Sequence, residues 1–283
     1  MRGFLGGSLD FSGTVLMRCC GGDLATTSTA LSKRAHASDS ELEVSPLEIL
    51  AMPRKPFKPF ADRHRGGQID IGIRTISQRP ELMLLVAKCL TSWPHIESEM
   101  ALLLGHLLGA QSGDAAMAVF NILRRSSAQR DAISEAGRVL DSVDRELLSA
   151  VLNVHKSVEA ERNALAHGQM GTYSLMPDTL LWMTSADYIE FKALLVLKGD
   201  TTHSEEKRDK INSMLSYYEA KDLEQIAEDI DMMGWLWSEL RTYLQTMRPA
   251  THAELYRQLC DRPHIAQELE RLRREKTPLT PPG

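Results

Sequence analysis

Residues 143–168 read VDRELLSAVLNVHKSVEAERNALAHG, and this stretch decides the fold that we expect. Its apolar residues recur at steps of three, four and seven, which places them on one side of an α-helix: Leu147, Val151, Val154, Val158 and Leu165. Gly168 then occupies the position at which helices commonly end in a left-handed glycine. The stretch therefore predicts an amphipathic helix from about residue 143 to about residue 167.

A similar apolar stripe occurs three more times. One helix is expected from Pro80 to about residue 109, and Pro94 should kink it or split it in two. A second helix is expected over about 114–138, and the clearest stripe of the chain runs from Leu223 to Leu244. Four such helices bury their stripes best against one another, so we predict a mainly α protein built on a four-helix bundle.

A small β-hairpin insertion is expected between the third and the fourth helix. Residues 172–176 and 179–184 have the composition of short strands, and Pro177-Asp178 between them predicts a turn. The hairpin should lie at about residues 170–185. Residues 188–198 fit either a further strand or a short helix.

The two ends of the chain lack the pattern of the predicted bundle. Residues 1–76 are rich first in Gly, Ser and Thr and then in Pro and basic residues, which predicts a flexible or irregular extension, disordered or loosely packed. The bundle with its hairpin should occupy residues 77–248. Residues 249–283 should form short helices, broken at Pro263, and a Pro-rich tail.

Composition narrows the class of protein. A net charge of −5 argues against a protein that coats DNA, although a local basic cleft is compatible with it. The sequence has no apolar run of the roughly 18 residues that a membrane helix needs, and its start lacks the apolar core of a signal peptide. Four cysteines show no zinc-like spacing: Cys19, Cys20, Cys89 and Cys260. We expect a cytoplasmic protein without a membrane segment, metal or cofactor.

The end of the third predicted helix combines a permanent cation, an amide and an imidazole. Glu159, Asn163 and His167 follow one another at steps of four, so they share one helix face, and Arg162 and His155 lie near its boundary. An arginine binds phosphate oxygens with two N–H groups, and an imidazole can take a proton from an RNA 2′-hydroxyl or give one to a leaving oxygen. These residues predict a polar ridge suited to phosphodiester chemistry without a metal.

The sequence Arg-Asn-Ala-Leu-Ala-His-Gly over residues 162–168, at the end of an amphipathic helix, resembles the HEPN superfamily of helical-bundle domains. The resemblance covers about residues 78–246. It implies a metal-independent endoribonuclease, often a toxin or an antiviral effector, whose Arg and His meet in a cleft between two protomers. By this resemblance, Arg162 holds the scissile phosphate of single-stranded RNA, Asn163 orients it and His167 transfers a proton.

The same resemblance implies a homodimer and leaves room for an antitoxin or another partner protein. Toxins of this superfamily that pair with nucleotidyltransferase antitoxins carry a Tyr two residues after the His. Gln169 occupies that position here, and Tyr173 is the nearest tyrosine downstream. The resemblance therefore does not extend to that subgroup.

Two other interpretations stay open. Some HEPN proteins have lost catalysis and bind a partner protein or a nucleotide. In a purely structural reading, Glu159 forms an ion pair with Arg162 one turn away, while His167 stabilises the helix C-terminus electrostatically.

Two further predictions concern residues outside the third helix. His95, Glu97 and Glu99, near Pro94, could face the same cleft, and Glu97 is the candidate binding residue among them, although a solvated helix surface is the more common role of such residues. Trp235 and Trp237 are interpreted as core anchors rather than as a platform for base stacking.

Overall fold

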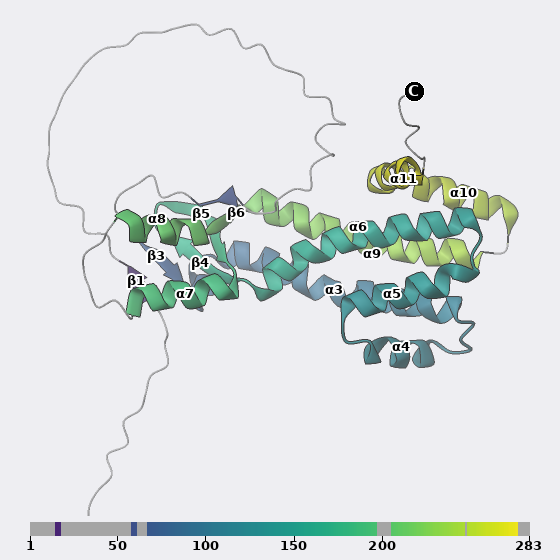
Figure 1. Cartoon of the computed structure of the whole chain (residues 1–283), viewed down its shortest axis with the longest axis horizontal. Helices are drawn as coiled ribbons and strands as arrows, with labels where there is room; N and C mark the ends of the chain where they lie inside the picture. Colours follow the sequence, from purple (N-terminus) through teal and green to yellow (C-terminus); the bar gives the residue numbers. More distant parts are fainter. Residues whose placement is uncertain (1–14, 18–57, 61–66, 197–204, 247, 277–283) are drawn as a thin grey trace, which may run out of the picture. The chain divides into compact units, whose positions relative to one another are not determined.

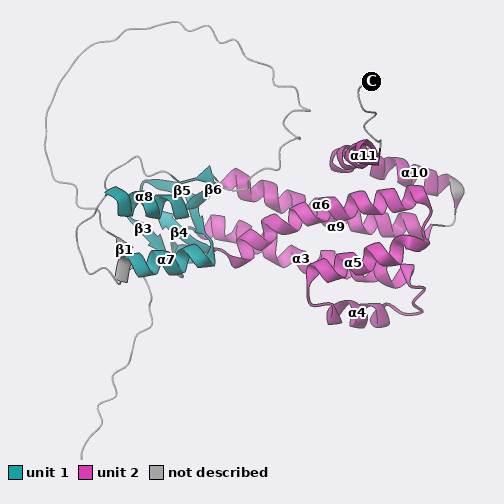
Figure 2. Ribbon diagram, viewed as in Figure 1, with its two compact units in different colours: residues 1–79, 169–218 teal, residues 80–168, 219–283 magenta. Residues whose placement is uncertain are grey.

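The structure is a computed structural model, and it is mainly helical with a small antiparallel sheet. It describes residues 15–17, 58–60, 67–196, 205–246 and 248–276. The chain divides into two compact units, which Figure 2 colours separately. A sheet unit contains residues 1–79 and 169–218, and a helical unit contains residues 80–168 and 219–283.

Three long helices form the centre of the helical unit: α3 (Pro80–Leu107), α6 (Ser142–His167) and α9 (Ala220–Gln245) (Figure 1). α3 packs along α9, and α6 contacts both. Each helix buries most of its predicted stripe, which removes apolar surface from water and stabilises the unit. The buried residues include Trp93, Ile96, Leu103, Leu147, Val151, Val158, Ile230, Met233 and Trp237. The helices predicted around Leu147 and from Leu223 to Leu244 are confirmed.

The ends of α6 are defined by local contacts. Asp141 caps its start, because the Asp141 carboxylate accepts hydrogen bonds of 2.9 Å from the backbone N–H groups of Val143 and Asp144. At its other end, Gly168 donates its N–H to Ala164. Gly168 has φ −80° and ψ 159°, so the predicted left-handed cap is wrong. The chain leaves the helix in an extended conformation because strand β4 begins at the next residue.

Of two predictions about the first half of the helical unit, the structure narrows one and corrects the other. α3 is a single helix of 28 residues with Pro94 inside it, so it is not split. The second predicted helix is instead two helices, α4 (Gly113–Ile122) and α5 (Ser126–Ala136). The break allows Phe120 of α4 and Ile133 of α5 to be buried, and both helices contact α3. Packing, rather than a Gly or Pro signal, sets this break.

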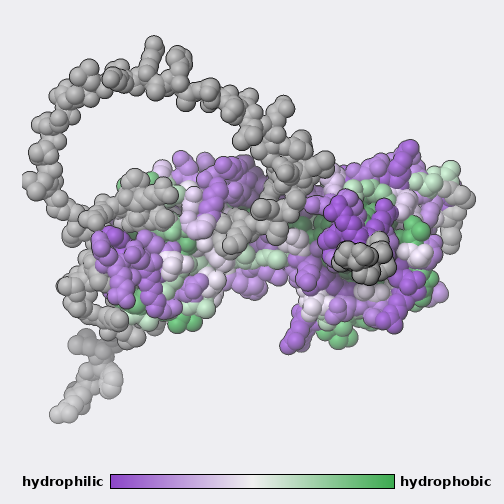
Figure 3. All heavy atoms as spheres, turned by 45° about the horizontal axis from the view of Figure 1, so that its top comes forward, coloured by the Kyte–Doolittle hydropathy of each residue, from purple (hydrophilic) through white to green (hydrophobic). Residues whose placement is uncertain are grey.

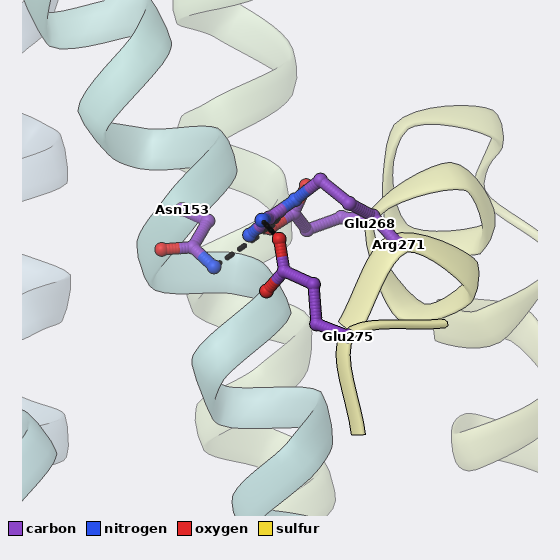
Figure 4. Close-up of polar contacts among 4 residues, drawn as sticks. All are labelled: Asn153, Glu268, Arg271 and Glu275. Carbon is purple, nitrogen blue, oxygen red and sulfur yellow. Dashed lines mark hydrogen bonds and ion pairs between the residues drawn. The ribbon is translucent and has the colours of Figure 1, made fainter. Parts of the chain in front are cut away.

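The predicted C-terminal helices are confirmed as α10 (Pro249–Cys260) and α11 (Pro263–Lys276). α11 packs on α6 and buries Ile265 and Leu269. A polar contact supports this packing, because Asn153 of α6 donates a 2.7 Å hydrogen bond to Glu268, which also pairs with Arg271 (Figure 4). The visible surface is mostly hydrophilic, with apolar side chains in small separate patches (Figure 3).

The sheet unit contains a six-stranded sheet within the described residues, in the order β1-β3-β4-β5-β6-β2. Side chains from the strands pack against α7 and α8 in one apolar cluster that includes Tyr173, Leu181, Phe191 and Ile211. A short helix, α2 (Thr75–Gln78), contacts β4. The remaining bounds are β1 Val15–Met17, β2 Lys58–Pro59, β3 Ile69–Ile71, β4 Gln169–Tyr173, β5 Met176–Met183, β6 Ser216–Glu219, α7 Ser185–Val196 and α8 Glu205–Met214.

The predicted hairpin is confirmed as the antiparallel pair β4–β5. Its turn is at residues 174 and 175, however, and Pro177 and Asp178 lie inside β5, so the predicted turn position is wrong. Residues 185–196 are helical, which decides the ambiguity left at 188–198. The hairpin is also part of a larger sheet rather than a small insertion, because β4 pairs with β3 on its other side.

Part of the predicted N-terminal extension is folded. Phe60, Ile69 and Ile71 are 4%, 6% and 2% exposed and belong to the core of the sheet unit. β2 and β3 have two and three residues, and they pair with strands more than 95 residues later, so local periodicity could not reveal them. The prediction of a flexible segment otherwise falls on residues 1–14, 18–57 and 61–66, which lie outside the described residues.

Candidate functional site

All six residues predicted for the site lie in the helical unit: Glu97 on α3, and His155, Glu159, Arg162, Asn163 and His167 on α6. They do not form the single polar ridge that the sequence predicted. Two of them are interior, three follow towards the end of α6, and Glu97 stands apart. The contacts of each group show what it can do chemically.

His155 is an interior residue, with 1% of its surface exposed. Its Nδ1 accepts a 3.2 Å hydrogen bond from the indole N–H of Trp237, and its ring centroid lies 5.2 Å from that of Trp93. Burial, with a smaller contribution from the charge of Arg130, lowers the pKa of His155 to about 3. His155 is therefore neutral at neutral pH, and its environment corrects our expectation of a surface binding residue.

Glu159 is also interior, and it pairs with a residue that the sequence analysis did not select. Arg130 of α5 forms an ion pair with the Glu159 carboxylate and also donates a 2.9 Å hydrogen bond to Ser126. The two charged side chains are only 17% and 10% exposed. Burial lowers the pKa of Arg130, because removing a guanidinium from water disfavours its charged form. Glu159 therefore fastens α6 to α5 rather than lying on an exposed ridge.

Arg162 is half-buried, and its guanidinium lies over the indole of Trp93, with 5.6 Å between Cζ and the ring centroid. This distance is within the range of a cation–π contact. One Nη donates a 3.0 Å hydrogen bond to the side-chain oxygen of Asn163. The buried Nε has no hydrogen-bond partner among the described residues. Arg162 is thus held in place, while several of its five N–H groups have no hydrogen-bond partner among the residues that the structure describes.

His167 is exposed and is the last residue of α6. Five residues turn an α-helix by about 500°, so the side chains of Arg162 and His167 leave it about 140° apart. Asn163 and His167, four residues apart, share a face. The motif therefore presents a fixed guanidinium and an exposed imidazole on different sides of one helix end.

Glu97 is half-buried, one turn beyond Trp93 on α3. No ion pair or hydrogen bond joins it to Arg162 in the part of the chain that the structure describes. The acidic side chain with a defined partner on α3 is instead Glu99, which pairs with Arg241 at 2.8 Å. Glu97 therefore remains a surface candidate without a contact to the motif.

The two tryptophans of α9 differ sharply. Trp237 is fully buried, as predicted for a core anchor, whereas Trp235 is 70% exposed and is not a core residue. Both lie on one helix two residues apart, so they point to different sides of it. The expectation is confirmed for Trp237 and wrong for Trp235.

Sequence reasoning missed Arg130 and the role of Trp93. Arg130 was visible as a charge that interrupts the stripe of the second predicted helix, and such a charge in an apolar face indicates a buried partner. Trp93 is spaced with the other apolar residues of its helix, such as Ile96 and Met100, and that spacing indicates only a core residue. Neither its stacking with Arg162 nor its contact with His155 can be read from the spacing of residues.

The described residues offer neither a metal site nor a membrane-spanning helix. No group of three His, Cys, Asp or Glu side chains there is arranged to hold a metal ion. None of the helices there combines the length and the apolar character that crossing a membrane requires.

Comparisons of the chain with protein-family models, with curated proteins and with solved structures found no match.

Proposed function

We propose that this protein is a metal-independent endoribonuclease of the HEPN type, active as a homodimer in a defence or stress response. In this proposal α3, α5, α6 and α9 serve as the four-helix bundle. The observation that carries the proposal is the state of Arg162. Its guanidinium is oriented by Trp93 and Asn163 but has no carboxylate partner among the described residues, and exposed His167 follows on the same helix.

The proposed chemistry uses these three side chains. Arg162 binds the non-bridging oxygens of the scissile phosphate and stabilises the negative charge that develops in the transition state. Asn163 keeps the guanidinium in orientation through the 3.0 Å hydrogen bond. His167 takes the proton of the 2′-hydroxyl, which attacks the phosphorus and leaves a cyclic phosphate, or protonates the departing 5′-oxygen. Neither step requires a metal.

A second protomer accounts for the angle between the two catalytic side chains. Because Arg162 and His167 leave the helix about 140° apart, one α6 alone does not direct both at one phosphorus atom. Two copies of α6 related by a two-fold axis place the Arg162 of one protomer near the His167 of its partner. The proposed active form is therefore the dimer, with two such sites.

The experiment is cleavage of single-stranded RNA by the purified protein in EDTA. We expect cutting that yields cyclic phosphate ends, its loss in His167→Ala, and a strong decrease in Arg162→Lys, because an ammonium cannot reproduce a two-point contact. His264→Ala, which removes a histidine of α11, is the matched control and should cut normally. If His167→Ala is folded, as judged by circular dichroism, and still cuts RNA at the wild-type rate, the assignment is wrong.

A specific observation favours a second candidate, a non-catalytic module of the same type that binds a nucleotide or a partner protein. The Trp93 contact and the Asn163 hydrogen bond hold Arg162 partly inside the unit, where it also serves packing. The module predicts nucleotide or partner binding that Arg162→Met abolishes, with no RNA cutting by the wild type. RNA cutting that is lost in His167→Ala supports the endoribonuclease and rejects the non-catalytic module.

A further inference from the structure

Glu159 lies between two arginines. Arg130 reaches it from α5, and Arg162 follows it by three residues on α6. An acidic and a basic residue three apart on a helix are neighbours and commonly form an ion pair. Here the Glu159 carboxylate forms its ion pair with Arg130 instead, and Arg162 contacts Trp93 and Asn163.

The burial of Glu159 makes this choice of partner consequential. A carboxylate that is only 10% exposed loses most of its hydration, and an unpaired charge in such a place is strongly unfavourable. If Arg130 were absent, Glu159 would require another cation. Arg162 is one turn away, it carries uncommitted N–H groups, and its buried Nε has no hydrogen-bond partner among the described residues.

We propose that Arg130 is a positioning residue that keeps Arg162 available to a phosphate by neutralising Glu159. This inference rests on the proposed function, because it explains how the arginine of the motif stays free for RNA. It adds a residue from another helix, 32 positions before Arg162 in the chain, that never touches the substrate. Because Glu159 is paired with Arg130, it does not bind Arg162, and Arg162 can therefore contact a phosphate.

The test measures Arg162 directly, without relying on RNA cleavage. Phenylglyoxal modifies arginines, and the rate at each one can be followed by mass spectrometry of peptides. In Arg130→Gln, Glu159 is expected to capture Arg162 and lower its rate about tenfold, a typical scale for a new partly buried ion pair. In Arg130→Gln with Glu159→Gln, the competing charge is gone and the rate should return to that of the wild type.

Arg241→Gln is the matched control. It breaks the pair of Arg241 with Glu99, whose side chains are 23% and 10% exposed, similar to those of the Arg130 pair. This variant should lose stability to a similar degree while the modification rate of Arg162 stays unchanged. An equal decrease in Arg241→Gln assigns the effect to general destabilisation and overturns the proposal.

If Arg130→Gln does not fold, a more conservative substitution at the same position tests the proposal. Arg130→Lys keeps a cation but loses the planar guanidinium, one Nη of which contacts both Glu159 and Ser126, so its interaction with the carboxylate is weaker. We expect the rate at Arg162 to fall about threefold, between the wild type and Arg130→Gln. A rate equal to that of the wild type in every folded Arg130 variant overturns the proposal.

RNA measurements separate this proposal from the proposed function. If the wild type cuts RNA, the double variant should recover the cutting and the RNA affinity that Arg130→Gln loses. Cutting by the wild type without recovery in the double variant rejects the role of Arg130 and leaves the endoribonuclease standing. Capture of Arg162 in Arg130→Gln, with no RNA cutting by the wild type, supports the positioning role and rejects the endoribonuclease.

Discussion

Two histidines of α6, His155 and His167, lie three turns apart and have opposite environments. His155 is 1% exposed, accepts a hydrogen bond from Trp237 and has a pKa lowered to about 3. His167 ends the helix and is exposed. We call His155 and Glu159 with their partners the interior segment, and residues 162–167 the terminal segment. One helix thus carries polar groups enclosed by other helices and, at its end, an exposed imidazole.

Residue type and helix face therefore do not decide the role of a polar side chain by themselves. The interior segment is enclosed by α3, α5 and α9, and both Nδ1 of His155 and the Glu159 carboxylate have partners within the protein. Nε2 of His155 is buried without a hydrogen-bond partner among the described residues. The terminal segment lies where α6 ends, and its histidine meets solvent. Substitutions in the two segments should therefore differ in their cost to stability.

Trp237→Ala should have the largest effect. It removes a fully buried indole and leaves Nδ1 of His155 without its donor, so we expect a loss of about 4 kcal/mol in the free energy of unfolding. Urea denaturation measures this loss. Trp235→Ala, on the same helix but 70% exposed, should change stability by less than about 0.5 kcal/mol. Equal losses contradict the division of α9 into a buried and an exposed face.

His155→Phe should remove part of the acid sensitivity of the fold. The pKa of His155 falls from 6.5 to about 3 on folding, so below pH 6.5 the unfolded chain binds a proton that the folded protein refuses. Stability therefore declines as pH falls. Lowering the pH from 7 to 5 should therefore decrease the free energy of unfolding of the wild type by about 2 kcal/mol through this one group.

The measurement is urea denaturation of both proteins at pH 7 and pH 5. Carboxylates contribute to both chains, so the difference between wild type and His155→Phe isolates the histidine. At pH 7 the free energy of unfolding of His155→Phe should fall further below that of the wild type than it does at pH 5. An identical pH dependence shows that His155 is not the enclosed, neutral group described above.

Arg162→Met should separate stability from binding. The cation–π contact and one hydrogen bond together indicate a loss of about 1 kcal/mol or less, since methionine keeps much of the apolar stem. Binding of an uncleavable 2′-O-methyl RNA, measured by fluorescence anisotropy, should fall at least about tenfold. Arg145→Met, an exposed arginine of the same helix, is the control. A loss as large as that of Trp237→Ala places Arg162 in the interior segment.

His167→Ala should be the mildest change. An exposed residue at a helix end contributes little to packing, so the free energy of unfolding should change by about 0.5 kcal/mol or less. Thermal unfolding followed by circular dichroism checks this expectation. A large loss of stability instead indicates that His167 has a structural role, and the terminal segment then resembles the interior one.

Local pattern predicted the long helices well. The spacing of Leu147, Val151 and Val158 predicted α6 to within one residue at its start, because the periodicity of a helix is contained in neighbouring residues. Caps were less predictable. Gly168 has the residue type of a left-handed cap, yet its conformation follows the strand that comes next.

Strands and breaks depended on partners that are far away in the sequence. Ile69 and Ile71 pair with β4 about a hundred residues later, and nothing in residues 1–76 announces that pairing. The break between α4 and α5 contains neither Gly nor Pro. It is set by how Phe120 and Ile133 are buried against α3.

Local sequence is sufficient to specify that α6 is an amphipathic helix and that its last turns carry Arg162, Asn163 and His167. These are properties of residues within a few positions of one another. Only the tertiary structure decided that Glu159 pairs with Arg130, that His155 is enclosed with Trp237, and that Arg162 lies over Trp93. The physical reason is that burial and pairing of a polar side chain are set by neighbouring helices, and no local periodicity encodes which helix that will be.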